Sequence, residues 1–262
     1  MITSTGNARI RSLVHLKKSR KERREADCFL VEGPKMFREL PPELLREAYA
    51  SASFLRSAEG REIAAQCGKE ITEVSDEVFQ YLSDTKSPQG ILALVSQLHY
   101  AREDLTGEKS GKKALLMILE DVQDPGNVGT ILRTAEAAGA TGVLLTDGCA
   151  DLTAPKTVRS TMGSIYRVPF LYTRNLAGEL DALKKEGVRT FAAHLKGAVS
   201  LWEADMSGPA AFLIGNESRG LREETAALAD ASVKIPMSGR VESLNAAMAG
   251  SLLLYEAKRQ RS

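Results

Sequence analysis

Short apolar runs alternate with helical patterns through the second half of the chain, and this alternation restricts the fold more than any other feature. Residues 114–119 are apolar throughout, which is typical of a strand buried on both faces of a sheet. Comparable runs follow near 142–146, 168–172, 189–193 and 210–214. Helical patterns separate most of these runs, and strand–helix alternation predicts an α/β fold around an open parallel sheet.

The first hundred residues predict a smaller α/β domain, because short strand and helix patterns alternate there as well. Residues 99–112 are polar, contain two glycines and lack an apolar period. They predict a linker, although a long surface loop inside one domain would have the same composition. The 262 residues suffice for two ordinary domains. We therefore expect one domain at 1–98 and a second at 113–262.

Positive charge is concentrated at the N-terminus. The whole chain is nearly neutral, with 35 Lys and Arg against 34 Asp and Glu, whereas residues 1–25 contain eight Lys or Arg and two Glu. The segment from Asn7 to about Arg24 has the apolar spacing of one amphipathic helix. Such a helix suits contact with nucleic-acid phosphates, and a solvated helix face is the alternative. The residues that would contact RNA are Arg9, Lys17, Lys18, Arg20 and Lys21.

Several classes of protein lack support in this sequence. Cys28, Cys67 and Cys149 are far apart, and no CxxC pair or histidine cluster suggests a metal site or a disulfide framework. No segment has the roughly 20 apolar residues of a membrane span, and no signal-peptide pattern opens the chain. A GxGxxG motif after the 114–119 run, a P-loop and a GxSxG elbow are missing as well. We therefore expect a soluble cytoplasmic protein without a metal.

A polar turn follows the first apolar run, at the end of the strand where catalytic residues collect in parallel α/β sheets. This turn, residues 121–129, leads into a helix that carries Arg133. Asn127 is expected to cap the start of the helix, and Gly129 allows another backbone to approach closely. A polar cap followed by an arginine suits an anionic ligand, although ordinary capping beside a surface arginine is the commoner arrangement.

Two further turns have more glycine and polar residues than a simple connection needs. Residues 215–220 follow a buried run directly and carry two glycines and four polar side chains. An ordinary connecting turn is the alternative interpretation. Residues 235–245 bring Ser243 and Asn245 to the start of the last helix. Structural capping by Ser243 is the alternative to a role in chemistry. The three turns together form the candidate site.

Taken in order, these turns resemble the signature motifs of the SpoU (TrmH-like) family of RNA methyltransferases. The second turn resembles G-N-E-x-x-G-L, and the third resembles I-P-M followed by S-L-N. Residues 160–169 are similar to an intervening S-x-G…P segment, with Ser164 where alanine is usual. The first turn matches N-x-G-x-x-x-R-x-A-x-x-x-G through Asn127, Gly129, Arg133, Ala135 and Gly139.

The first hundred residues resemble the RNA-recognition domain of the same family more weakly. The resemblance is carried by residues 29–33, Phe-Leu-Val-Glu-Gly, and by the segment that begins Pro88-Gln89-Gly90. Pro88 stands where a histidine is often found, so the resemblance does not assign an RNA contact to this loop.

The resemblance implies transfer of a methyl group from S-adenosylmethionine to a ribose 2′-hydroxyl, with ribosomal RNA the first candidate substrate and transfer RNA the second. It also implies a SPOUT domain with a deep C-terminal trefoil knot, and a homodimer that meets at the knot. Cofactor contacts would come from Gly215, Asn216, Ile235, Met237 and Leu244. The polar site beside the methyl group would consist of Asn127, Arg133, Glu217, Ser243 and Asn245.

Two questions stay open at this point. Arg133 could remove the proton as a base, or it could clamp a phosphate and stabilise the developing alkoxide, because a free guanidinium has a pKa of roughly 12.5–13.8. The chain could also be a catalytically silent RNA-binding relative, or a knotted enzyme that methylates a base nitrogen. The presence of Asn127 together with Arg133 favours transfer to ribose.

Overall fold

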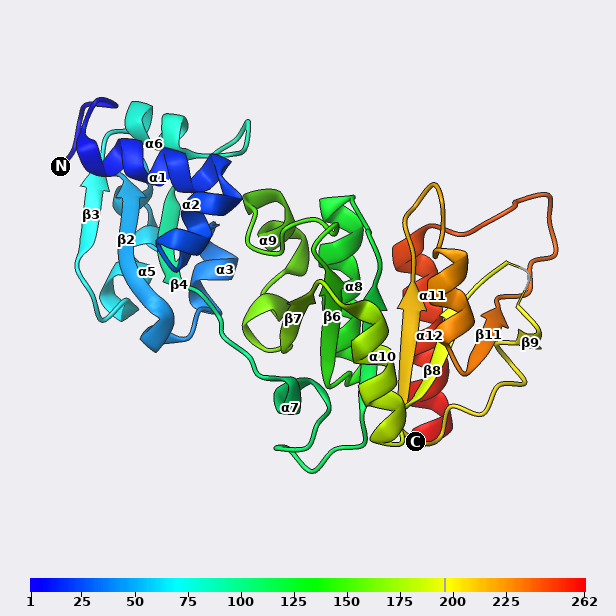
Figure 1. Ribbon diagram of the computed structural model, residues 1–262. Coiled ribbons are helices and arrows are strands. Elements are labelled where there is room, and N and C mark those ends of the chain that lie inside the picture. Colours follow the sequence, from blue (N-terminus) through cyan, green and yellow to red (C-terminus); the bar gives the residue numbers. More distant parts are fainter. Residues whose placement is uncertain (196) are drawn as a thin grey trace. The chain divides into compact units, whose positions relative to one another are not determined.

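The computed structural model describes residues 1–195 and 197–262, which form two compact units. The first unit contains residues 1–99 and 151–166, and the second contains residues 100–150 and 167–262. Each unit has its own sheet, its own helices and its own hydrophobic core (Figure 1). The chain therefore passes between the units three times, rather than once through a linker as the sequence predicts.

The first unit is built on a four-stranded sheet with the order β1-β4-β2-β3. Its strands are β1 (Cys28–Glu32), β2 (Leu45–Ser51), β3 (Ile71–Val74) and β4 (Ile91–Ser96). The pair β2–β3 is parallel, and β4 runs antiparallel to both β1 and β2. The α-helices are α1 (Ala8–Lys18), α2 (Arg20–Glu25), α3 (Pro34–Arg38), α4 (Ala52–Arg56), α5 (Ala58–Gln66), α6 (Asp76–Leu82) and α9 (Pro155–Thr161). Two 3₁₀ turns complete it, η1 (Pro42–Leu44) and η2 (Ser164–Tyr166).

The N-terminal basic segment forms two helices instead of the single helix that its apolar spacing predicts. Helix α1 ends at Lys18, and Ser19 adopts an extended conformation with φ −118°. The Ser19 hydroxyl then accepts a hydrogen bond from the Glu22 amide and caps α2. Apolar spacing does not reveal this break, because Ile10 and Leu13 still turn toward the core of the first unit.

The second unit is a seven-stranded sheet with the order β7-β6-β5-β10-β8-β11-β9, and all of its pairs are parallel. The strands are β5 (Leu115–Leu119), β6 (Gly142–Thr146), β7 (Phe170–Thr173), β8 (Arg189–Ala193), β9 (Val199–Ser200), β10 (Ala210–Ile214) and β11 (Ala231–Lys234). The helices are α7 (Arg102–Leu105), α8 (Pro125–Ala138), α10 (Leu176–Lys185), α11 (Glu223–Leu228) and α12 (Ala246–Arg261). The parallel α/β architecture expected from the alternating pattern is confirmed.

Both faces of this sheet are covered, which explains why its central strands are apolar throughout (Figure 1). Leu116 and Ile118 pack in a core with Leu180 and Leu183 of α10. Met117 points the other way, toward Gly250 of α12. None of the described helices is long and apolar enough to cross a membrane.

Residues 99–112, which the sequence predicts as a linker, contain a helix that packs on the second unit. Leu105 of α7 is buried and lies against Gly142, where a Cβ atom would come within 2.6 Å of it. Arg102 donates to Glu179 at 3.1 Å and pairs with Glu186. These partners are more than 70 positions away in the chain, so the composition of the segment gives no sign of them.

Residues 151–166 are held in the first unit by a buried ion pair. Arg23 is 4% exposed, and its Nη2 lies 2.6 Å from Oδ2 of Asp151. The same guanidinium donates to Thr153 at 3.2 Å and to the Leu16 carbonyl at 2.6 Å. Burial by itself would raise the pKa of Asp151, but hydrogen bonds from Arg23 and Thr153 outweigh it and hold the pKa below its ordinary value.

We expect Arg23→Ala to lower the free energy of unfolding by about 3–5 kcal/mol at pH 7, because Asp151 is left buried and charged without its partner. The folded pKa of Asp151 is lowered, so its contribution is complete above the unfolded pKa of about 3.9 and is lost as pH falls through the folded value. Urea unfolding followed by circular dichroism should therefore give a difference that shrinks below about pH 4.

Lys21→Ala is the matched control, since Lys21 lies on the same helix with an 81% exposed side chain paired to Glu25. It should change the unfolding free energy by less than about 0.5 kcal/mol. Equal stabilities for the two variants would show that the Arg23–Asp151 pair does not hold the segment.

Candidate active site

The three polar turns meet at one edge of the second unit's sheet through a chain of hydrogen bonds. The Glu217 carboxylate accepts from the amides of Gln123 at 3.1 Å and Asp124 at 3.0 Å, and from Nδ2 of Asn127 at 3.0 Å. Oδ1 of Asn127 then accepts from Nδ2 of Asn245 at 2.9 Å. One side chain from each of the three turns therefore takes part in a single network.

Asn127 joins this network because another residue caps helix α8. The N-cap is Asp124, whose carboxylate accepts from the Asn127 amide at 2.9 Å. The sequence prediction that Asn127 occupies the cap position is therefore wrong. Asp124 lies three residues earlier and satisfies the free backbone donor, which leaves both polar atoms of the Asn127 side chain for Glu217 and Asn245.

The last helix begins at Ala246, later than the apolar pattern suggests, and its N-cap is Asn245. Oδ1 of Asn245 accepts from the amides of Ala247 at 2.9 Å and Met248 at 3.3 Å. One asparagine thus caps α12 and donates to Asn127. Ser243 lies before the cap, so its alternative role as the capping residue is excluded.

A cavity of about 760 Å³ lies beside this network, within the size range of small-molecule sites. The residues predicted to bind a cofactor all line it: Gly215, Asn216, Ile235, Met237 and Leu244. Glu217 and Ser243 line it as well, which connects the polar network to the cavity. His194 and Leu195, after β8, were missed from the sequence, although they also follow an apolar run.

The loop after β10 can fold back on itself because position 215 is a glycine. A Cβ atom there would lie 2.1 Å from both the Gly220 carbonyl carbon and the Leu221 nitrogen. The loop closes through reciprocal backbone hydrogen bonds between Asn216 and Gly220 at 3.1 and 2.8 Å. Nδ2 of Asn216 also donates to the Asp121 carbonyl at 2.8 Å. This hydrogen bond connects the loop after β10 to the loop after β5, in addition to the contacts made by Glu217.

A buried carboxylate at the end of β5 gives the site further support that the motifs do not reveal. Glu120 is 2% exposed and accepts from the Arg222 amide at 2.8 Å and from the Thr225 hydroxyl at 2.5 Å. The Arg222 side chain pairs with Asp121 at 2.8 Å. These contacts hold the start of α11 against the first turn and so fix both ends of the 215–222 loop.

Glu217 is an anion at neutral pH. Partial burial raises its pKa, but hydrogen bonds from Asn127, Asp124 and Gln123 are together stronger, and the pKa lies below its ordinary value. An ionised carboxylate is purely an acceptor, which matches the three donors that point at it. Its negative charge at the wall of the cavity suits a cationic ligand. The described residues contain no group of His, Cys, Asp and Glu placed to hold a metal ion.

Arg133 is exposed on α8, two turns beyond the start of the helix. Six residues of α-helix rotate by about 240°, so Arg133 and Asn127 point in different directions. Within the part of the chain that the structure describes, Arg133 makes no hydrogen bond or ion pair with Asn127, Glu217 or Asn245. The structure therefore brings together three of the five predicted polar residues, places Ser243 at the cavity wall, and leaves Arg133 apart.

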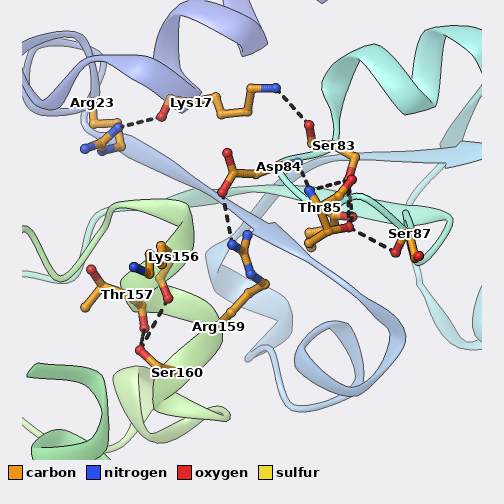
Figure 2. Close-up of polar contacts among 11 residues, drawn as sticks. Lys17, Arg23, Ser83, Asp84, Thr85, Ser87, Lys156, Thr157, Arg159 and Ser160 are labelled. Carbon is orange, nitrogen blue, oxygen red and sulfur yellow. Dashed lines mark hydrogen bonds and ion pairs between the residues drawn. The ribbon is translucent and has the colours of Figure 1, made fainter. Parts of the chain in front are cut away.

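The residues predicted to contact RNA lie in the first unit, and they differ in their freedom to do so. Nζ of Lys17 donates to the Ser83 carbonyl at 2.9 Å (Figure 2). It also donates to the Tyr81 carbonyl at 3.1 Å. Lys17 therefore closes the end of α6, and burial lowers its pKa. Arg20 is half-buried with Nε 4.0 Å from Asp151. Arg9, Lys18 and Lys21 are exposed.

Comparison with known families follows the division of the sequence into two parts. Residues 114–255 match the SpoU rRNA Methylase family. Residues 7–93 match the MRM3-like substrate binding domain. The first match covers more than half of the chain and includes all three turns of the site.

Similar proteins include the 23S rRNA (guanosine(2553)-2′-O)-methyltransferase RlmP of Bacillus subtilis (strain 168), which is 34% identical over 92% of this chain and 92% of its own length. The 23S rRNA (guanosine-2′-O-)-methyltransferase RlmB of Xanthomonas axonopodis pv. citri is 36% identical over 79% of this chain and 84% of its own. The likeness therefore extends through both parts of the sequence.

Solved structures agree over almost the whole chain. The SpoU methyltransferase AviRb of Streptomyces viridochromogenes, solved in complex with S-adenosylmethionine, has a TM-score of 0.87 at 27% identity and covers 97% of this chain and 98% of its own. An S-adenosylmethionine-bound rRNA methyltransferase of Sinorhizobium meliloti has a TM-score of 0.84 at 30% identity, with 98% and 97% covered.

We expect Glu217→Gln to lower the free energy of unfolding by about 1 kcal/mol, a modest value because Glu217 is exposed to water. The amide NH₂ group cannot accept from the Gln123 or Asp124 amide, so one backbone donor loses its partner. Hydrogen exchange at these two amides should become faster. The folded pKa of Glu217 is lowered, so the wild-type advantage is present above about pH 4.3 and disappears as pH falls further.

Glu223→Gln provides the matched control, because Glu223 also lines the cavity but its side chain is 90% exposed. Exchange at Gln123 and Asp124 should stay at the wild-type rate in this control. If Glu217→Gln leaves that exchange unchanged too, the carboxylate does not anchor the 121–127 turn.

Proposed function

The chain belongs to the SpoU rRNA methylase family, and we propose on this premise that it transfers a methyl group from S-adenosylmethionine to a ribose 2′-hydroxyl of ribosomal RNA. Transfer RNA is the second candidate substrate, since the solved neighbours include an enzyme of 2′-hydroxyl methylation on tRNA with a TM-score of 0.52. We also propose that this chain is cytoplasmic.

The observation that carries the proposal is the network of Asn127, Glu217 and Asn245, which reaches the wall of the 760 Å³ cavity through Glu217. Each residue comes from a different motif of the family, and Asn127 is hydrogen-bonded to both of the others. A relative that binds RNA without catalysing methyl transfer would not need all three of these side chains. The network therefore favours an active enzyme over a binding protein.

The cavity has the chemistry that S-adenosylmethionine requires. Val233, Ile235 and Leu244 give it apolar walls for an adenine ring, and Gly215 lets the backbone fold closely around it. The Glu217 carboxylate supplies a negative charge for a sulfonium or ammonium group. When bound, the cofactor supplies an electrophilic methyl group. We assign its contacts to Gly215, Asn216, Ile235, Met237 and Leu244.

The chain's own residues must position a ribose hydroxyl and assist the removal of its proton. Asn127 and Asn245 hold the turns in fixed positions, which preorganises the site. Glu217 accepts three hydrogen bonds from the 121–127 turn and has a lowered pKa, so we assign it an anchoring role rather than that of a base. Arg133 is exposed and cationic, and we propose that it grips the substrate phosphate and stabilises the developing alkoxide. Ser243 remains a candidate to contact the hydroxyl.

We further propose that the protein is a homodimer that meets at α12 and at a C-terminal trefoil knot. The apolar run from Leu252 to Tyr255 is only partly buried within the single chain. Leu253 and Leu254 are buried, whereas Tyr255 is 49% exposed. Met248 is 58% exposed and Leu252 is half-buried. These three positions share one face of the helix, so an apolar stripe is available for a partner. The first unit would bind the RNA substrate.

We expect the wild-type protein to methylate total ribosomal RNA, and Arg133→Ala to reduce the rate by at least ~100-fold while binding the cofactor normally. Transfer of labelled methyl groups, followed by nucleoside digestion and mass spectrometry, measures both the rate and the position. Arg133→Lys should keep part of the activity with a raised KM for RNA, because lysine is a cation without the planar fork that grips phosphate.

Calorimetry with S-adenosylhomocysteine is the control for folding, and it should give one site per chain in wild type and variant alike. A methylated base instead of a 2′-O-methyl nucleoside would contradict the proposed reaction. Wild-type rates in Arg133→Ala would transfer the proton-handling role to Ser243, or to Glu217 in place of the anchoring role assigned to it above.

We expect light scattering to give roughly twice the chain mass of 28.4 kDa. Met248→Glu combined with Tyr255→Glu should shift this to the monomer mass, because two charges in the apolar stripe oppose its burial. Trp202→Glu is the matched control: Trp202 is 56% exposed but lies outside α12, and its change should leave the dimer intact. A wild-type monomer at micromolar concentration would contradict the assembly.

A further inference from the structure

The first unit contains a hollow as large as the cofactor cavity, about 780 Å³. It lies between α3, α4, α6 and the loop before β4. The residues that line it include Lys35, Phe54, Asp76, Pro88 and Gln89. Nothing in the proposed methyl transfer uses this hollow, although it contains residues of the Pro88-Gln89-Gly90 segment that the sequence singled out.

The rim of this hollow is fixed by a buried carboxylate. Glu32 is 8% exposed at the end of β1, and it accepts from the Ser83 hydroxyl at 2.7 Å and from the amides of Asp84 at 3.2 Å and Gln89 at 3.4 Å. Ser83 also bonds to Thr85 within the same loop (Figure 2). A buried charge matched by donors from one loop holds that loop in a single conformation.

Two glycines with positive φ bring the walls close together. Gly33 has φ +107°, and a Cβ atom there would come within 2.0 Å of Oε1 of Gln89. Gly90 has φ +82°, and a Cβ atom would come within 2.5 Å of Phe54. The 88–90 loop and the Phe54 ring therefore rest directly on bare backbone. The hollow is a built feature and not a gap left by loose packing.

The walls of the hollow differ in chemistry. Phe54 is half-buried, with Pro34 and Pro88 nearby, so one part of the surface is flat and apolar. Lys35 is exposed at the rim, whereas the other cation, Arg38, pairs with Glu59 at 2.7 Å. Asp76 faces the hollow from α6 and is held by the Ser53 amide at 3.0 Å and the Ser53 hydroxyl at 2.6 Å through one carboxylate oxygen.

We propose that this hollow binds one unpaired nucleotide of the RNA substrate, with its base stacked on Phe54 and a neighbouring phosphate beside Lys35. The inference rests on the proposed function, since it takes RNA to be the substrate. Base stacking on an aromatic ring is a common way to hold single-stranded RNA. The Asp76 carboxylate can only accept, so it favours bases that present an exocyclic amino group. Adenine, cytosine and guanine have one, whereas uracil has only its N3–H, which lies between two carbonyl oxygens that repel the carboxylate.

The test measures binding of the full chain to short fluorescein-labelled oligo(A), oligo(C) and oligo(U) by fluorescence anisotropy. Wild type should bind oligo(A) and oligo(C) more tightly than oligo(U). Phe54→Leu keeps an apolar side chain against Gly90 but removes the stacking surface, and it should weaken oligo(A) binding by ~5-fold or more. Phe54→Tyr should restore it.

Variants at two exposed residues, Lys35 and Asp76, test the hollow without disturbing the core of the first unit. Lys35→Ala should weaken all three oligonucleotides and lower the salt slope by about 0.7, as expected for one lost phosphate contact on a single strand. Asp76→Asn can still accept from Ser53 but can also donate, so the preference for oligo(A) and oligo(C) over oligo(U) should shrink. Tyr81→Leu removes an aromatic side chain that is 46% exposed outside the hollow, and it should change nothing.

Unchanged affinities in Phe54→Leu, Lys35→Ala and Asp76→Asn would overturn the inference, and so would an equal loss in Tyr81→Leu. Failure of the proposed function has a different signature. In that case wild type would transfer no methyl group to ribosomal RNA, whatever its affinity for the oligonucleotides or its dependence on Phe54.

Discussion

The Glu217 carboxylate is the contact on which the catalytic edge of the sheet depends. It takes three donors from the 121–127 turn, and Asn127 passes the connection on to Asn245 at the start of α12. Parallel strands deliver three loops to the same edge but do not specify how the loops stand relative to one another. That relation comes from the ionised Glu217, which only accepts, and from the side chains of Asn127 and Asn245. Each asparagine side chain donates through its nitrogen and accepts through its oxygen.

The same physical device occurs elsewhere in the chain. Glu32 in the first unit fixes the 83–89 loop, and Glu120 in the second holds the start of α11. Glu32 and Glu120 are buried, where a charge is tolerated only if donors match it. In all three cases a carboxylate at or just after a strand end organises the loop that surrounds a cavity. Rigid loops are what a methyl-transfer site and a nucleotide-binding hollow both need.

Helices α8 and α12 connect the site with the proposed dimer. Helix α12 begins at Asn245 in the polar network and carries the stripe of Met248, Leu252 and Tyr255 along its exposed face. Helix α8 begins beside Asn127 and presents Arg133 to solvent. Their buried faces pack on each other and on the sheet, with Gly250 close to Met117 and Ile131. A change in assembly would therefore act on the helices that carry the proposed catalytic side chains.

The sequence by itself determined the parallel α/β sheet and identified the three turns that meet at one edge of it, because apolar periodicity and motif order are local properties that one chain displays directly. It did not determine that Asp124 rather than Asn127 caps α8, since two capping residues three positions apart compete and geometry selects between them. The sequence also did not show whether Lys17 contacts RNA or another part of the chain, or whether the polar residues 99–112 form a linker or pack on a domain. Lys17 closes a helix 64 residues away, and Arg23 meets Asp151 across 128 residues. Only tertiary structure decided these points, because each depends on a partner brought near by the fold, and composition contains no record of which distant groups will meet.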